Sequence, residues 1–167
     1  LARPHGATEL DRLVDADMKP IISNNVVYAL AYNGHLVAID LFKGKELWSR
    51  KYAGYKDIAL SGSTIFLTDY QGFVYAVDRN SGKEVWVNNQ LSYRNLTGVT
   101  VANQYIVVGD GEGYLHWLNR DNGKFVAQQA LDSDGLYVDP VPTASYLYLQ
   151  TRSGDLIAIE KPSLSDK

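Results

Sequence analysis

Residues 34–48 read GHLVAIDLFKGKELW, and the same pattern returns as GFVYAVDRNSGKEVW at 72–86 and GYLHWLNRDNGKFVA at 113–127. An incomplete copy, GDLIAIEKP, occupies 154–162. The glycines that open the four copies, at 34, 72, 113 and 154, are 38, 41 and 41 residues apart. A fixed period of roughly 40 residues is typical of propellers and solenoids. The chain is therefore a tandem array of one structural unit.

Each copy belongs to a unit of four short strands. Eight β-prone residues precede each copy, as in VVYALAYN and TIFLTDYQ, and a short apolar stretch such as KPIIS or DIALS lies further upstream. β-branched and aromatic residues fit a pleated, half-buried surface, and glycines allow tight hairpin turns. No segment has the 3.6-residue periodicity of a long helix. We expect an all-β chain of β-propeller blades, with about three complete four-stranded blades and an incomplete last blade.

The repeat also divides the chain. Residues 1–18 are expected to form an inter-blade segment and loop, the blades to occupy 19–161, and residues 162–167 to form a disordered tail. The individual blades are expected at 19–56, 57–97, 98–138 and 139–161. Because the last blade lacks an outer fourth strand, sheet faces and an edge are left exposed, and two such open arrays can associate through them.

An Ala-x-Asp-x3-Gly-x3-Trp frame runs through the first two copies. We expect the alanine in a buried strand, the aspartate accepting hydrogen bonds from turn amides, and the tryptophan docked between adjacent blades. Burying such a ring contributes roughly 3 kcal/mol or more. The third copy departs from the frame, so its outer docking contact should be weaker. The blade-docking residues are Ala38, Asp40, Gly44 and Trp48, then Ala76, Asp78, Gly82 and Trp86, then Asn119 and Gly123, with Trp117 and Ala127 in the remaining places of the third copy.

Composition narrows the possible functions. The 167 residues carry a net charge of −3 with a pI near 5.5, so the chain has no basic footprint for nucleic acid. It contains no cysteine, which excludes a disulfide framework, a thiolate metal site and a lipid-bearing cysteine within this stretch. The start, LARPHGATEL, lacks the order of a secretory signal, so any export signal is expected upstream.

Several possible sites are interpreted as structural. The GDGEG stretch at 109–113 lacks the lysine and helix of a phosphate loop and the spaced oxygens of a calcium loop, so it predicts a hairpin turn. His5, His35 and His116 lie in different repeats without metal-ligand spacing. We therefore expect no catalytic residues, no metal and no cofactor. Among the tyrosines, those near blade ends are interface candidates: Tyr52, Tyr55, Tyr70 and Tyr93.

The repeated frame resembles the tryptophan-docking motif of quinoprotein-type propellers. Two further stretches, 6–34 and 107–129, resemble the carboxy-terminal half of the BamB family of outer-membrane-protein assembly lipoproteins. This resemblance implies half of an eight-bladed, non-catalytic propeller at the periplasmic face of the outer membrane, lipid-anchored in the full-length protein. It implies docking on the periplasmic domains of the insertase BamA. On the family pattern the partner-binding residues are Asp15 and Asp17, with Arg12 as a secondary candidate.

Other functions stay open at this point. Exposed strand edges can pair with extended segments of unfolded outer-membrane protein clients, and two half-propellers can self-associate. A quinoprotein-type dehydrogenase shares the docking motif, but the chain lacks the vicinal cysteines and the compact acidic calcium ligands which that resemblance would require. A generic propeller that binds a small ligand is the third possibility.

Overall fold

The computed structural model describes residues 18–31 and 34–162, which form four antiparallel sheets in chain order. The first blade contains β1 (Ile21–Ser23), β2 (Val26–Leu30), β3 (His35–Asp40) and β4 (Glu46–Lys51). The second contains β5 (Ala59–Ser61), β6 (Thr64–Thr68), β7 (Val74–Asp78) and β8 (Glu84–Asn88). The third contains β9 (Thr100–Ala102), β10 (Tyr105–Gly109), β11 (Tyr114–Asn119) and β12 (Phe125–Ala130). The last contains β13 (Val141–Pro142), β14 (Tyr146–Gln150) and β15 (Leu156–Glu160).

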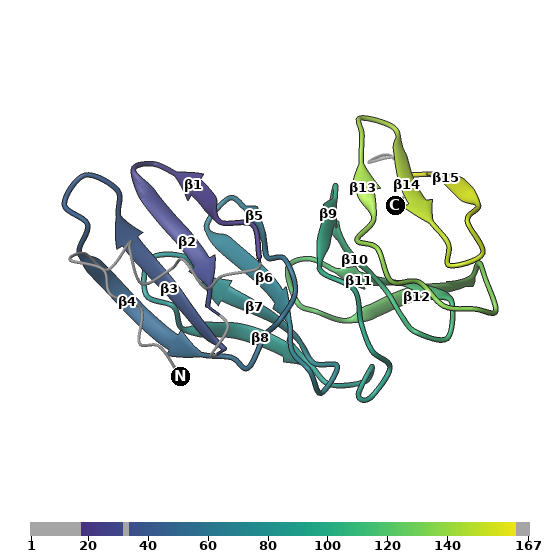
Figure 1. Cartoon of the computed structure of the whole chain (residues 1–167), viewed down its shortest axis with the longest axis horizontal. Coiled ribbons are helices and arrows are strands. Elements are labelled where there is room, and N and C mark those ends of the chain that lie inside the picture. Colours follow the sequence, from purple (N-terminus) through teal and green to yellow (C-terminus); the bar gives the residue numbers. More distant parts are fainter. Residues whose placement is uncertain (1–17, 32–33, 163–167) are drawn as a thin grey trace.

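Every sheet is a meander in which each strand pairs with the next strand along the chain. The sheets fan out in chain order, with β1, β5, β9 and β13 toward one side of the fan (Figure 1). β9 contacts both β5 and β13, so the third blade meets the blades before and after it along their first strands. We call the three interfaces between consecutive blades the first, second and third seams.

Most of the hydrophobic core lies in these seams. The central strands of the second and third blades are buried on both faces because each of these blades packs against a neighbour on either side. The first blade has a further buried cluster of its own, formed by Val27, Ala29, Val37 and Ile39. Tyr28, Leu36 and Ile65 pack in the first seam, and Phe66, Ile106 and Leu118 pack in the second. Trp117, Leu147 and Leu149 belong to the cluster of the third seam. The outer strands β4, β8 and β12 present exposed side chains, as expected for strands at the rim.

The first strands of neighbouring blades are tied by carboxylates at equivalent places in the repeat. Asp57 accepts a hydrogen bond from the Lys19 amide at 2.9 Å, and Asp139 accepts one from the Gly98 amide at 2.6 Å. A Cβ at Gly98 would lie 2.3 Å from a carboxylate oxygen of Asp139. The third and last blades can therefore approach closely only because residue 98 has no side chain.

The turns between the third and fourth strands are held by the aspartate or asparagine of the frame. Asp40 accepts hydrogen bonds from the Phe42 and Lys43 amides, and Asp78 does the same for Asn80 and Ser81. Asn119 replaces the carboxylate in the third blade and accepts from the amides of the two residues that follow Arg120. Gly44, Gly82 and Gly123 follow with φ of 63°, 67° and 68°, a conformation in which a side chain is strained.

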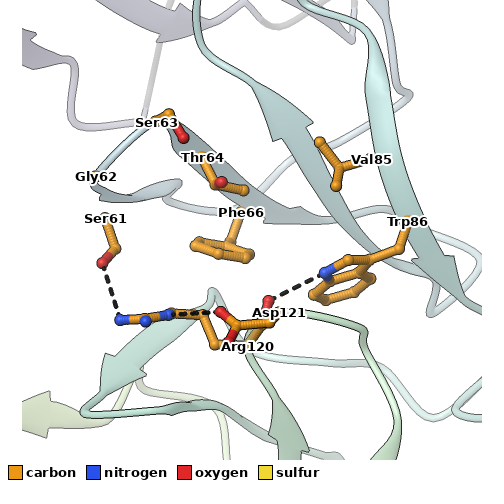
Figure 2. Close-up of a pocket in the computed structure, with 9 residues that line it drawn as sticks. All are labelled: Ser61, Gly62, Ser63, Thr64, Phe66, Val85, Trp86, Arg120 and Asp121. Carbon is orange, nitrogen blue, oxygen red and sulfur yellow. Dashed lines mark hydrogen bonds and ion pairs between the residues drawn. The ribbon is translucent and has the colours of Figure 1, made fainter.

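The tryptophans of the first two blades cross the seams and reach these turns. Trp48 Nε1 donates to the Arg79 carbonyl at 3.0 Å, and Trp86 Nε1 donates to the Arg120 carbonyl at 3.0 Å. Figure 2 shows the second of these contacts, with the indole of Trp86 beside the turn of the third blade. Each indole lies on the turn glycine of the next blade, since a Cβ at Gly82 would be 2.5 Å from Trp48 Cε3. A Cβ at the equivalent glycine of the third blade would be equally close to Trp86.

The third blade contains the same pair of residue types with their positions exchanged. Ala38 faces Trp48 across β3 and β4, and Ala76 faces Trp86 across β7 and β8. In the third blade the tryptophan is on the inner strand, where Trp117 of β11 faces an alanine of β12, Ala127. Trp117 is buried and donates to a side chain of its own blade, Gln129 Oε1, at 3.1 Å. The third seam is therefore built without an indole on its outer strand.

Replacing Gly82 by alanine should destabilise the chain strongly. A left-handed conformation costs a residue with a Cβ about 1–2 kcal/mol, and overpacking against Trp48 adds about 1–3 kcal/mol. Gly62 is the matched control, because its φ is 58° and a Cβ there meets no atom within 4 Å. Chemical denaturation should give a clearly larger loss of unfolding free energy for G82A than for G62A. Equal losses would mean that docking of the Trp48 indole does not require the absence of a side chain at position 82.

Candidate functional site

One end of the blade array is formed by long linkers and by the hairpins between second and third strands. We call this the linker face; it contains the linkers 52–58, 89–99 and 131–140 and the hairpins 69–72, 110–113 and 151–154. Hydrogen bonds join linkers and hairpins in alternation, so these segments form one continuous surface. The bonds are Tyr70 N to Ala53 O, Tyr93 N to Gln71 O, Gly111 N to Arg94 O, Leu136 N to Asp110 O, and Ser153 Oγ to Asp132 Oδ2.

Exposed tyrosines gather on the linker face. Tyr55, Tyr70 and Tyr93 are 42%, 63% and 82% exposed. Tyr137, which sequence reasoning missed, is 49% exposed and lies beside Arg152, whose guanidinium is 5.2 Å from the ring centre. Tyr52 differs from these, because it is partly buried and donates its hydroxyl to the Gly82 carbonyl at 2.9 Å. Tyr52 therefore serves the first seam, whereas the other four present rings to the surroundings.

A buried ionic cluster fixes the linker that carries Tyr93. Asp110 is fully buried and accepts hydrogen bonds from Arg94 Nε at 2.5 Å and from His116 Nε2 at 2.6 Å. Its other oxygen accepts from the amides of Glu112 and Tyr114, so the GDGEG stretch forms a hairpin, as its sequence predicts. Arg94 also pairs with Glu112 at 2.9 Å. The cluster therefore connects the linker between the second and third blades to the hairpin of the third blade.

This environment controls the charge of Asp110. Burial opposes ionisation, but hydrogen bonds from His116, from the Tyr114 amide and from Arg94 outweigh it and lower the pKa of Asp110 to about 2. The aspartate of the preceding hairpin, Asp69, accepts from backbone amides in the same way and also from the Tyr75 hydroxyl at 3.1 Å. Burial and the Asp69 charge raise the pKa of Tyr75, so this phenol stays neutral.

The opposite end, which we call the turn face, is more uniform. It contains the frame turns 41–45, 79–83 and 120–124, and Phe42, 78% exposed, is the large apolar residue that stands out on it. Arg79 and Arg120 follow the frame residue in the second and third blades, and each reaches back toward the preceding blade. Arg120 Nη1 contacts Ser61 Oγ at 3.5 Å (Figure 2). It also donates to a backbone carbonyl of its own blade at 3.1 Å.

A groove of about 290 Å³ opens at this point in the second seam, lined by Ser61, Thr64, Trp86 and Arg120 among others (Figure 2). The arginine in it is already bonded to protein groups, including Asp121 at 3.4 Å. We therefore assign the two arginines to blade packing. Sequence reasoning missed them, although both stand directly after the frame residue in consecutive repeats.

The predicted partner-binding residues cannot be placed in the same way. Asp15, Asp17 and Arg12 lie outside the described residues.

Within residues 18–31 and 34–162, no three histidine, cysteine, aspartate or glutamate side chains are grouped closely enough to hold a metal ion. The same residues include no helix that is long and apolar enough to cross a membrane.

Acid should weaken the fold through Asp110. Because the pKa of this carboxylate is lower in the folded chain than its ordinary value, its stabilising contribution is present above about pH 4 and is lost as the pH falls toward 2. The shift corresponds to about 2 kcal/mol. Urea unfolding across this range should show a smaller acid loss for D110N, which is already less stable near neutral pH, than for the exposed control D134N. Parallel pH profiles for the two variants would contradict the assignment.

Comparisons with known proteins agree with this fold. A family model described as outer membrane protein assembly factor BamB matches residues 1–88 and again 71–165. Outer membrane protein assembly factor BamB of Aliivibrio fischeri is 52% identical over 153 residues, which are 92% of this chain and 40% of that protein. The chain thus spans about 40% of the length of this relative.

Solved structures give the same result. The crystal structure of BamB from Moraxella catarrhalis matches with a TM-score of 0.81 and 27% identity, over 93% of this chain and 46% of that one. Quinohemoprotein alcohol dehydrogenase from Comamonas testosteroni matches with a TM-score of 0.58 and 19% identity, over 68% of this chain and 21% of that one, which shows a shared fold alone. The expected propeller fold is confirmed, and the chain belongs to the BamB family of outer membrane protein assembly factors.

Proposed function

We propose that these blades are part of a non-catalytic scaffold at the periplasmic face of the outer membrane. The scaffold docks on the periplasmic domains of BamA and assists the assembly and insertion of outer-membrane proteins. Membership of the assembly-factor family supports the biological setting. The structural observation that carries the proposal is the concentration of exposed tyrosines on the linker face.

The chemistry of the linker face suits a protein partner. Tyrosine brings a large, rigid, amphipathic ring at low conformational cost, and tyrosine and arginine are enriched in protein interfaces. Charged groups on the same face, such as Glu112 and Arg152, are exposed and can form a polar rim. The backbone here is also held in place before binding, since Tyr93 has a φ of 64° and its amide is bonded to the Gln71 carbonyl at 2.7 Å. A preorganised surface loses less entropy when a partner docks.

By its place in the repeat, the acidic pair corresponds to residues of a later copy that belong to the linker face. The first and second copies are offset by 38 residues, as Gly34 and Gly72 show, so Asp15 and Asp17 correspond to positions 53 and 55. Position 55 is the exposed Tyr55 of the linker face. We therefore assign the carboxylates and the tyrosines to one docking surface, in which the charges increase specificity and association rate and the rings supply buried area.

Binding to purified BamA periplasmic domains tests this assignment. D15R/D17R should weaken binding of the chain at physiological salt by about tenfold or more, with the larger part in the association rate. Y93N should also weaken it, because asparagine accepts the positive φ and only the ring is lost. F42S removes an exposed ring from the turn face and is the control that should bind normally.

Biolayer interferometry can measure all three variants alongside the parent chain. Equal binding by Y93N and the parent, with weaker binding by F42S, would place the surface at the turn end. If the parent chain itself does not bind BamA, the function proposed for this part of the protein is wrong.

A further inference from the structure

The third seam contains an apolar notch where the other two seams hold an indole. The notch has a volume of about 150 Å³ and opens to solvent. Its lining residues are Tyr105, Trp117, Val126, Ala127, Gln129, Ile159, Glu160 and Pro162. Ala127 occupies the place of Trp48 and Trp86 in the repeat, and Val126 occupies the place of Val85. The notch is therefore the equivalent, in the third seam, of the groove shown in Figure 2 for the second seam. It differs in having alanine instead of tryptophan on the outer strand.

The inner position of Trp117 explains why the notch is open. Its indole packs edge-on against Tyr105 at a centroid distance of 5.8 Å and bonds to Gln129 of its own blade. It therefore forms one wall of the notch and leaves the space above Ala127 open. An apolar space of roughly 150 Å³ is large enough for a benzene-sized ring.

The last blade offers the acceptor that an indole uses in the other seams. Trp48 and Trp86 donate to the carbonyls of Arg79 and Arg120, whose own amides donate to the preceding hairpin at 2.9 Å each. Lys161 stands at the same place, and its amide donates to the Ser145 carbonyl at 2.8 Å. The Lys161 carbonyl is therefore the counterpart of the two carbonyls that receive an indole N–H.

The edge beside the notch suits an extended chain. β12 is the last strand of its sheet among the described residues, and all six of its residues are exposed. An extended segment that adds to an edge gains affinity from main-chain hydrogen bonds, and a pocket for one of its side chains gives specificity. Beside β8 the equivalent groove already contains the Trp86 indole and the bonded Arg120 side chain, and beside β4 the Trp48 indole is docked on the next blade.

We propose that the notch binds a tryptophan side chain of a partner polypeptide that lies in extended form along β12. The guest indole fills the space over Ala127 between Val126 and Ile159, and its N–H donates to the Lys161 carbonyl. The guest indole takes the place in the third seam that Trp48 and Trp86 take in the first two, although the turn glycine of those seams is replaced by leucine at position 164. This site is separate from the linker face, and its occupation does not depend on binding to BamA.

Nuclear magnetic resonance titration of the chain tests the proposal with a short peptide of alternating threonine and valine around one central tryptophan. Backbone shifts should map to β12 and to Ile159 and Lys161. Replacing the tryptophan of the peptide by alanine should weaken binding by about tenfold or more, which is about 1.4 kcal/mol. Equal binding of the two peptides, or shifts that map elsewhere, would overturn the proposal.

Two matched variants separate the notch from edge pairing in general. Val126 and Val85 are 50% and 56% exposed at equivalent places on β12 and β8, so neither substitution disturbs the core. V126K should weaken binding of the tryptophan peptide by about tenfold, whereas V85K should leave it unchanged. Equal effects of the two lysines would mean that the notch gives no specificity.

Returning the tryptophan to the outer strand provides a second test. W117A/A127W restores the residue pattern of the first two blades, so the variant should stay folded and should lose binding of the tryptophan peptide because its own indole fills the notch. Persistent binding by the folded variant would overturn the proposal. A titration of the chain without peptide is the control for a second copy as occupant: concentration-dependent shifts confined to the notch would assign it to self-association and contradict a separate partner.

Discussion

The contact on which the rest of the structure depends is the indole of one blade lying on the turn glycine of the next. A four-stranded sheet of short strands has little stability by itself, so each blade needs a neighbour on its faces. Trp48 provides a large buried surface, and its N–H is satisfied by the Arg79 carbonyl, so burial leaves no donor unpaired. Gly82 admits the ring because it has no Cβ, and Asp78 holds the turn that presents this glycine.

This requirement explains why the two ends of the array differ. At the turn face, the frame residues must recur because they form the docking surface for an indole, and Asp40, Asp78 and Asn119 hold their turns in the same manner. At the linker face, amide-to-carbonyl bonds and the Asp110 cluster hold the linkers and hairpins together, and neither uses an outward tyrosine ring. The outward rings of Tyr70 and Tyr93 are therefore not required by the fold, and they are available for a partner.

In the third blade the frame changes, but the total side-chain volume of the cross-strand pair stays the same. Exchanging tryptophan and alanine between β11 and β12 keeps one large and one small residue in the cross-strand pair, as a packed interior requires. The exchange moves the indole bond from the next blade to Gln129 and leaves the outer position small. On its other face the same blade buries Asp110 with His116 and Arg94, which replaces part of an apolar seam by a paired charge.

The sequence alone determined the number of blades, the meander within each blade and the roles of aspartate and glycine in the turns. These features depend on residues close together along the chain, and four repeats display the same signal. The alternation and turn chemistry that predict β3 also predict β7 and β11. The exchange of Trp117 and Ala127 was visible as a departure from the frame, and the weaker outer contact expected from it stays a prediction.

Only the tertiary structure decided which tyrosines are exposed, which hydrogen bond Trp117 makes and where an open notch remains. Tyr52 and Tyr55 are three residues apart, yet one bonds to Gly82 of the next blade and the other faces outward. Ile159 of the last blade and Ala127 of the third blade line the same notch, although they belong to different blades. Such neighbours are set by how one blade lies against the next, and the repeat pattern, which describes each blade by itself, contains no information about that packing.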